Sequence, residues 1–211
     1  MENIVIVDCI RTGLAKSHRG TFNMTRSDDL VAHCIDALLT RNPQLDPAQV
    51  DDVVLGCGRQ IGEQSGNVAR HAVALSQLPI TVPATTISRA CSSGLNSIAI
   101  AATQIASGCA EIMLAGGVES ITGLSRGTPG EFAENPRLMS EKPDMYMAMG
   151  NTAEVVARRY QVTREAQDAY ALSSQQRYAA AEAAGYVKDE IAPMTCLLYT
   201  ADAADDLLCV D

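Results

Sequence analysis

The chain has 211 residues, of which 47% are apolar and 19% are charged, a composition that suits a packed globular protein and argues against disorder. Its formal net charge of −9 disfavours a nucleic-acid partner, because such partners are bound through basic patches. It has no apolar run long enough to cross a bilayer, and its first residues lack the basic and apolar regions of a signal peptide, so we expect a cytoplasmic protein without a membrane partner.

Alternating strands and helices are predicted over the first part of the chain. Four apolar runs predict buried strands: 4–9, 53–57, 84–88 and 111–118. Three segments between them have helical periodicity: 26–41, 66–76 and 92–107. The last of these helices is apolar on almost every side, so we expect most of its surface to be buried. This order of elements is typical of an α/β layer with a largely parallel sheet and right-handed crossovers.

The character of the sequence changes after Gly117. Residues 121–150 contain glycine, proline, methionine and charged residues with little periodicity, which predicts a long functional or interface loop. Helices are predicted again at 151–160 and 163–184, and Gly185 is a natural stop for the second. Residues 189–195 are predicted to enter another strand.

A glycine-rich stretch follows the predicted strand 53–57. Its spacing, G-x-G-x-x-x-G over residues 56–62, is one residue longer than the dinucleotide-binding fingerprint, and no acidic residue follows at the expected strand end. We therefore expect a turn in which glycine supplies positive φ angles, and not a nucleotide site.

The cysteines of the chain are odd in number and irregularly spaced, which does not indicate a disulfide framework. No CxxC pair is present, which argues against a structural zinc site, so we expect no metal. Most of the thiols are expected to be reduced and packed as small apolar side chains. The seven are Cys9, Cys34, Cys57, Cys91, Cys109, Cys196 and Cys209.

Cys91 lies just after the predicted third strand and next to the start of the predicted third helix. Ligands of α/β sheets gather at the carboxyl ends of strands. A helix N-terminus also offers N–H groups and a partial positive charge, which stabilise a thiolate or an oxyanion. The next three residues, Ser92 to Gly94, are small and leave room for a substrate carbonyl. From its position alone, Cys91 is either a reactive nucleophile or a buried thiol that fills a gap beside Ala90.

A cysteine nucleophile usually needs a base. His33 and His71 fall within predicted helices, and His18 falls in a loop near Lys16 and Arg19. No spacing marks any of these histidines as the partner of Cys91.

Several methionines gather around Tyr146. They either pack under the long predicted loop or form an adaptable apolar wall for an acyl group. They are Met139, Met145, Met147 and Met149.

Several motifs resemble those of the thiolase family. The stretch around Cys91, ISRACSSGL, resembles the acyl-enzyme motif of that family. Further matches follow the order of the family: Arg11 with Thr12, then 115–120, 149–154, 163–168 and 173–177. The resemblance covers residue 3 to about residue 194, and its ordered motifs favour the interpretation of Cys91 as a nucleophile.

The resemblance implies a thiolase-like layered α/β fold, with the first βαβαβαβ half-sheet in residues 1–120 and the start of a helical loop domain in 121–195. It implies an acyl-CoA:CoA C-acyltransferase that cleaves 3-ketoacyl-CoA with CoA, or runs the reverse Claisen condensation, through an acyl-cysteine intermediate on Cys91. The N–H of Cys91 would contribute to an oxyanion hole, and Met149 would line the acyl pocket. Acyl-CoA and CoA would be the partners, with no separate cofactor, and the full-length form would be a homodimer or homotetramer. Ala148 stands where some members carry a histidine.

The main departure from the family is the extent of the chain. Thiolases have two similar halves, and the histidine base, the Asn-Glu-Ala-Phe histidine and the second, acid/base cysteine belong to the half that this chain does not resemble. A lone half should expose a large apolar surface. The alternative function is therefore a truncated, non-catalytic piece that retains at most CoA-ester binding, and the alternative substrate is acetoacetyl-CoA. Residues 196–211 resemble the translation of a sequencing-library adapter, which predicts a tail that is not native.

Overall fold

The computed structural model describes residues 4–125 and 134–195. The chain divides into two compact units: the first runs to Pro129 and resumes at Glu190, and the second is Gly130–Asp189. The predicted tail, 196–211, lies outside the described residues. The domain bounds predicted from the sequence stay predictions.

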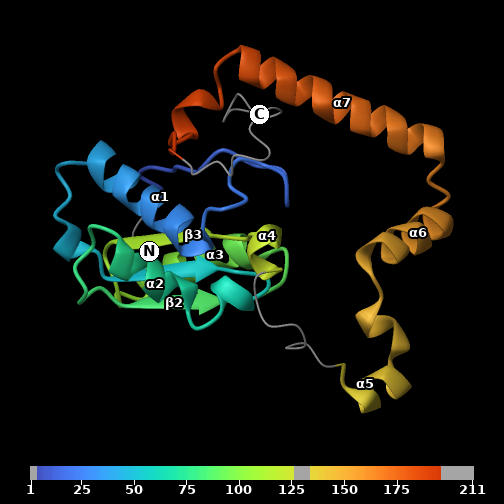
Figure 1. The fold of residues 1–211 in the computed structure, drawn as a ribbon, viewed down its shortest axis with the longest axis horizontal. Helices are drawn as coiled ribbons and strands as arrows, with labels where there is room; N and C mark the ends of the chain where they lie inside the picture. Colours follow the sequence, from blue (N-terminus) through green and yellow to red (C-terminus); the bar gives the residue numbers. More distant parts are fainter. Residues whose placement is uncertain (1–3, 126–133, 196–211) are drawn as a thin grey trace. The chain divides into compact units, whose positions relative to one another are not determined.

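The first unit is built on a parallel sheet of three strands in the order β2-β1-β3 (Figure 1). The strands are β1 (Asp52–Gly56), β2 (Ala84–Ile87) and β3 (Met113–Gly117). Val53 in β1 lies opposite Ala84 in β2 and Leu114 in β3. The strands predicted at 53–57, 84–88 and 111–118 are thus confirmed, as is their parallel arrangement. Because the strands are parallel, their carboxyl ends meet at one edge of the sheet.

The main core lies between β1 and two helices, α1 (Ser27–Arg41) and α2 (Val68–Leu75). Val53, Leu55 and Cys57 share one face of β1 because alternate residues of a strand point to the same side. They are buried in one cluster with Ile35 of α1 and Val68 of α2. Both helices were predicted within two residues of their observed bounds.

Three short helices lie in the connections of the first unit: η1 (Pro47–Gln49), η2 (Gly62–Gln64) and α4 (Ile121–Leu124). The carboxylate of Asp46 caps η1 by accepting a hydrogen bond from the Ala48 N–H at 2.9 Å. Ser120 caps the start of α4, because its Oγ accepts a hydrogen bond from the Gly123 N–H at 2.9 Å. Since η2 follows β1 and α4 follows β3, both bring side chains to the carboxyl edge of the sheet.

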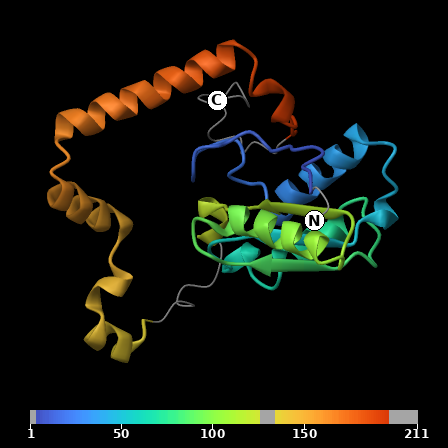
Figure 2. The same ribbon diagram turned by 180° about the vertical axis from the view of Figure 1, so that it is seen from behind.

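Helix α3 (Ser93–Ala106) lies on the face of the sheet opposite α2 (Figures 1 and 2). Its buried residues are small: Ser93, Ser97 and Ala101. The Ser97 Oγ donates to a β3 carbonyl at 2.7 Å. Leu95, in contrast, is 73% exposed. The prediction that most of this helix is buried is wrong, because the sheet backbone lies so close that only small side chains fit beneath it and the bulky ones remain outside.

This asymmetry predicts opposite results for two leucine truncations. Leu55 in β1 is 4% exposed, so Leu55→Ala should lower the free energy of unfolding by about 3 kcal/mol through lost burial and a cavity. Leu95→Ala removes the same atoms from an exposed side chain and should cost less than about 0.5 kcal/mol. Urea unfolding of both variants followed by circular dichroism measures the difference. Equal losses would contradict the exposed position of Leu95 on α3.

The predicted first strand, 4–9, is not a strand. Its side chains are exposed: 69% for Val5, 77% for Ile6 and 82% for Val7. A strand needs a neighbour for its backbone N–H and C=O groups, and none of the three strands described within 4–125 and 134–195 pairs with this segment. Instead, the Asp8 carboxylate accepts from the Arg41 guanidinium at 2.7 Å, which ties the segment to the end of α1. The apolar sequence correctly indicates a need for burial, but the described residues of the first unit leave these side chains exposed.

The predicted strand entry at 189–195 is confirmed only as an isolated β-bridge at Ile191. A short helix, η4 (Lys188–Glu190), is followed by an isolated bridge between Ile191 and Arg11. The Arg11 N–H donates to the Glu190 carbonyl at 2.7 Å, and its side chain forms an ion pair with the Glu190 carboxylate at 2.8 Å. These contacts fasten the last described residues to the start of the chain, but they do not extend into a ladder.

The second unit is helical. It contains α5 (Pro136–Glu141), η3 (Pro143–Tyr146), α6 (Met149–Tyr160) and α7 (Arg164–Ala183). The two predicted long helices are confirmed, with Thr163 capping α7 and Gly185, at φ 80°, following its end. The prediction of a loop over 121–150 is wrong where α4, α5 and η3 form. Proline at the first position of α5 and η3, with Asn135 as the cap of α5, favours these short turns.

Candidate active site

Cys91 lies in the tight turn between β2 and α3. Ala90, just before it, has a φ of 48°, in the left-handed region that residues with a side chain rarely adopt. The Cys91 side chain is exposed to solvent. The interpretation of Cys91 as a buried thiol is therefore wrong, and the thiol is open to a ligand.

Hydrogen bonds of Ser93 hold this turn in shape. The Ser93 Oγ accepts from the Arg89 N–H at 2.8 Å and donates to the Ala90 carbonyl at 2.6 Å. The Ser92 N–H donates to the Arg89 carbonyl at 3.2 Å, and the Ser93 N–H to the Ala90 carbonyl at 3.1 Å. These two N–H groups are engaged within the turn, so they are not the free oxyanion donors expected at the start of α3. A role of the Cys91 N–H as a donor stays a prediction.

The turn that carries Cys91 touches the loop that follows β1. The Ser88 Oγ donates to the Gly58 carbonyl at 3.1 Å, and a Cβ at Gly58 would lie 3.3 Å from the Ala90 carbonyl oxygen. The Gly58 N–H donates to the Glu119 carboxylate, which follows β3, at 2.8 Å. The carboxyl ends of all three strands are thus linked around Cys91. A sequence motif includes Glu119 but implies no role for it, and the sequence did not single out Ser93 or Gln64. Gln64 also lies at this edge of the sheet.

Glycine is needed in this stretch mainly because neighbouring backbone atoms lie very close to it, and less because the backbone adopts positive φ angles. A Cβ at Gly56 would lie 2.3 Å from the backbone carbon of Ser93, so β1 and the start of α3 can pack only through glycine here. Of the three glycines, Gly56, Gly58 and Gly62, positive φ is found at Gly62 alone, at 57°. The prediction of a positive-φ turn is therefore correct at Gly62 and wrong at the other two.

In the described residues, none of the three histidines is hydrogen-bonded to the turn that carries Cys91. His33 is in α1, where its Nε2 is buried without a hydrogen-bond partner. His71 is in α2, and the His18 N–H donates to the Thr122 Oγ at 2.8 Å. Within residues 4–125 and 134–195, no hydrogen bond joins a histidine to Cys91. The base for Cys91 therefore stays unassigned among the histidines of the described residues.

The methionine group belongs to the second unit. Met149 begins α6 and is 69% exposed, and Met145 in η3 is 67% exposed. Met139, in α5, is 38% exposed. Ordinary packing is therefore wrong for Met145 and Met149, whereas Met147 is half-buried. A place for Met149 in an acyl pocket with Cys91, which belongs to the first unit, stays a prediction.

The five described cysteines are free thiols with contrasting surroundings. Cys9, Cys91 and Cys109 are exposed, so the expectation that most thiols are packed is wrong for these three. Cys57 is fully buried at the end of β1. Burial, with a smaller contribution from the negative charge of Glu119, raises the pKa of Cys57 to about 11. Cys57 is therefore a neutral core thiol at physiological pH, and Cys91 is the thiol that meets solvent at the sheet edge.

The raised pKa of Cys57 predicts a loss of stability at alkaline pH. Because the unfolded chain releases this proton near the ordinary pKa of 9.0, stability is complete below that pH and falls as the pH rises toward the folded value of about 11. The free energy of unfolding should therefore drop more between about pH 8 and about pH 10.5 in the wild type than in Cys57→Ala. Urea titrations at the two pH values measure this, and identical drops would contradict the prediction.

Neither a metal cluster nor a membrane helix is found in the described part of the chain. No group of three or more histidine, cysteine or acidic side chains within 4–125 and 134–195 could hold a metal ion. None of the helices in these ranges has the length and apolar character to cross a membrane.

The layered α/β unit with an exposed cysteine after its second strand matches a known protein family. The family model described as "Thiolase, N-terminal domain" matches residues 4–205. The chain belongs to the thiolase family. The fold expected from the motifs is thereby confirmed as thiolase-like α/β. The thiolase match extends past residue 195 into the segment predicted to be a non-native tail, and the tail stays a prediction.

Curated proteins that are similar to this chain include bacterial thiolases. The chain is 42% identical over 195 residues to a 3-ketoacyl-CoA thiolase of Serratia proteamaculans, covering 92% of this chain and 50% of that protein. It is 43% identical over 214 residues to a beta-ketoadipyl-CoA thiolase of Acinetobacter baylyi, covering 92% and 52%. A 3-ketoacyl-CoA thiolase of Bacillus subtilis is 43% identical over 195 residues, with 92% and 49% covered. The chain thus spans about half the length of the curated relatives it matches.

Proposed function

We propose that Cys91 is the acyl-carrying nucleophile of an acyl-CoA:CoA C-acyltransferase that cleaves 3-ketoacyl-CoA with CoA or runs the reverse condensation. The observation that carries this proposal is the exposed thiol at the carboxyl edge of the parallel sheet, within the residues that the thiolase N-terminal model matches. The names of the relatives, which are 3-ketoacyl-CoA and beta-ketoadipyl-CoA thiolases, support the cleavage direction over a dedicated acetoacetyl-CoA synthase.

The chemistry at Cys91 would proceed in two transfers. In the first, the Cys91 thiolate attacks the 3-keto carbon of 3-ketoacyl-CoA, and the bond between C2 and C3 breaks. The electron pair of that bond remains on C2, which takes a proton, and acetyl-CoA leaves. In the second, the thiol of free CoA loses a proton and attacks the acyl-cysteine carbonyl. The shortened acyl-CoA leaves, and the Cys91 thiolate is restored.

The described residues supply the nucleophile but not the base. The sharp turn at Ala90 fixes where the Cys91 thiol is presented, next to the start of α3. The proton transfers require a base and an acid, which we assign to the second half of the family's fold. We also assign the exposed side of α3, at Leu95, to contact with that half. A cytoplasmic homodimer or homotetramer, with Met149 lining the acyl pocket, completes the proposal.

A second candidate is a non-catalytic piece that retains at most CoA-ester binding. It is favoured by the coverage of about half of each relative and by the exposed apolar side chains on α3 and in the N-terminal segment. The two candidates differ in whether a covalent bond to Cys91 forms.

Mass spectrometry of the chain after incubation with acetyl-CoA tests the proposal. A single acetyl adduct that maps to the peptide containing Cys91 is the expected result. A folded chain that forms no adduct but binds acetyl-CoA in calorimetry would support the second candidate and contradict the first.

A further inference from the structure

Gln64, at the end of η2, is a fully buried polar side chain that joins three parts of the first unit. Its Nε2 donates to the Arg59 carbonyl and to the Glu119 Oε1, both at 2.8 Å. Its Oε1 accepts from the Ser120 N–H at 2.5 Å and from the Ser27 Oγ at 3.3 Å. The amide therefore ties the loop after β1 to the segment after β3 and to the start of α1.

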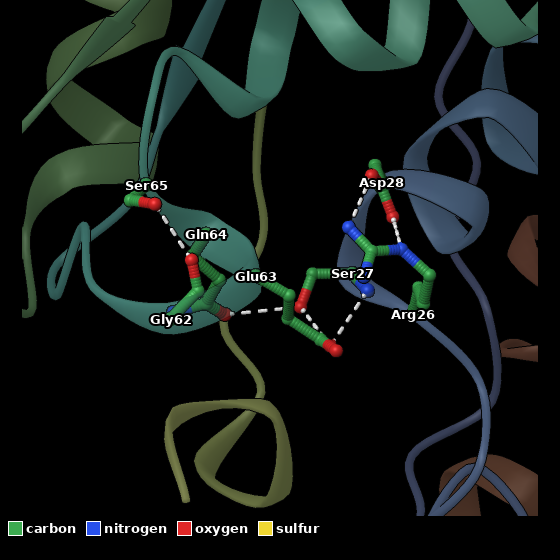
Figure 3. Close-up of polar contacts among 7 residues, drawn as sticks. All are labelled: Arg26, Ser27, Asp28, Gly62, Glu63, Gln64 and Ser65. Atoms are coloured by element: carbon green, nitrogen blue, oxygen red, sulfur yellow. Dashed lines mark hydrogen bonds and ion pairs between the residues drawn. The ribbon is translucent and has the colours of Figure 1, made fainter. Parts of the chain in front are cut away.

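The start of α1 is itself held against η2, as Figure 3 shows. The N–H and Oγ of Ser27 both donate to the Glu63 Oε1 at 3.0 Å, and Glu63 reaches across from η2 to meet them (Figure 3). The Arg26 guanidinium donates to both oxygens of the buried Asp28 carboxylate, at 2.9 and 2.8 Å. These contacts hold the start of α1 against η2, so the Gln64 amide has little freedom to move.

Two further hydrogen bonds connect this amide to the turn that presents Cys91. The second oxygen of Glu119, Oε2, accepts from the Gly58 N–H at 2.8 Å. The Gly58 carbonyl in turn accepts from the Ser88 Oγ at 3.1 Å, and the absent Cβ of Gly58 leaves room for the Ala90 carbonyl. Glu119 therefore sets the position of Gly58, and Gly58 contacts the turn just before Cys91.

We propose that Gln64 and Glu119 are a pair of positioning residues that fix the turn carrying Cys91 for acyl transfer, an inference that rests on the function proposed for Cys91. Neither side chain is hydrogen-bonded to the thiol, so both act through Gly58 and the turn. A shift of about 1 Å in a reacting group can slow a reaction about 10²-fold. A buried amide cannot lose one partner without leaving a polar group unpaired, so the pair holds one geometry in preference to others.

Isosteric single variants test the pair in the 211-residue chain. Glu119→Gln leaves one acceptor oxygen for two donors, the Gly58 N–H and the Gln64 Nε2. Gln64→Glu removes both hydrogen bonds that Nε2 donates and places two carboxylates side by side. Each should lower the rate constant for acetylation of Cys91 by acetyl-CoA about 10²-fold, measured by peptide-resolved mass spectrometry. The matched control is Glu182→Gln at an exposed position of α7, which should react at the wild-type rate.

The double variant, Gln64→Glu with Glu119→Gln, separates positioning from general damage. Its amide at position 119 can again offer oxygen to the Gly58 N–H and can donate to the carboxylate at position 64. The link to the Arg59 carbonyl is lost in both Gln64→Glu and the double variant. The double variant should therefore recover at least about tenfold in acetylation rate over each single variant, the non-additivity expected of contacting residues. Alkylation of Cys91 by iodoacetamide, which makes little demand on orientation, should stay within about twofold in all variants.

The outcomes distinguish this inference from the proposed function. If the wild type is acetylated at Cys91 and the single variants react at its rate, the positioning pair is wrong and the proposed function stands. If the single variants lose acetylation and alkylation together and the double variant recovers neither, the residues are merely structural and the inference is also wrong. If the wild type is not acetylated, the proposed function fails. The positioning pair is then tested by hydrogen exchange of the backbone amides of residues 88–93. Unchanged exchange rates in the single variants would overturn the pair. Faster exchange in the single variants that the double variant reverses would support it.

Discussion

Cys91→Ala is expected to abolish the acetyl adduct formed with acetyl-CoA while the free energy of unfolding changes by less than about 0.5 kcal/mol. The loss of the adduct follows from removal of the nucleophile. The small effect on stability follows from the exposure of Cys91 in the turn, since substitutions of exposed side chains seldom change stability by more than this amount. Intact-mass spectrometry and urea unfolding measure the two quantities on the same preparation.

A matched variant makes this experiment specific. Cys109 is another exposed free thiol of the first unit, beyond the end of α3. Cys109→Ala should therefore keep the full adduct on Cys91. An adduct that persists in Cys91→Ala, or that disappears in Cys109→Ala, would assign acylation to another thiol and contradict the proposed role of Cys91.

Gly56→Ala is expected to lower the free energy of unfolding by about 3 kcal/mol, because adding a Cβ overpacks the contact between β1 and α3. That Cβ would lie 2.3 Å from the Ser93 carbonyl carbon and 2.5 Å from the Gly94 nitrogen. These are backbone atoms, which cannot rotate away as the end of a flexible side chain can. The start of α3 must therefore move, and the turn with Cys91 moves with it. Urea unfolding followed by circular dichroism gives the stability.

Gly94→Ala is the control for this substitution. A Cβ at Gly94 meets nothing within 4 Å, and alanine is the better helix former, so this variant should be more stable by about 0.5 kcal/mol. If Gly56→Ala were as stable as Gly94→Ala, the close approach of β1 and α3 would be wrong.

The sequence predicted those elements of the first unit that pack on other parts of the same unit. The periodicity of α1, α2 and the three strands agrees with the observed bounds within about two residues, because their apolar faces meet in one core. The same reasoning failed for residues 4–9 and for the outer face of α3. Apolar periodicity indicates that a surface needs cover, but it does not indicate whether the chain itself provides that cover.

The candidate site was only partly predictable. Cys91 could be found because a strand end, a helix start and a family motif coincide at one residue. Gln64 could not, because a buried glutamine is satisfied by partners from three separate segments, and such contacts leave no local pattern. The engaged N–H groups of Ser92 and Ser93 were missed because the tightness of the turn depends on the left-handed φ at Ala90, which alanine rarely adopts.

That backbone angle at Ala90 has a consequence for how a ligand would be received. A left-handed conformation costs a residue with a Cβ about 1 kcal/mol relative to glycine, and the hydrogen bonds of Ser93 hold the turn against that cost. The strained turn is therefore set during folding and does not wait for a ligand to induce it. An arriving thioester would meet a preorganised thiol, so little ordering entropy would be lost at this turn on binding.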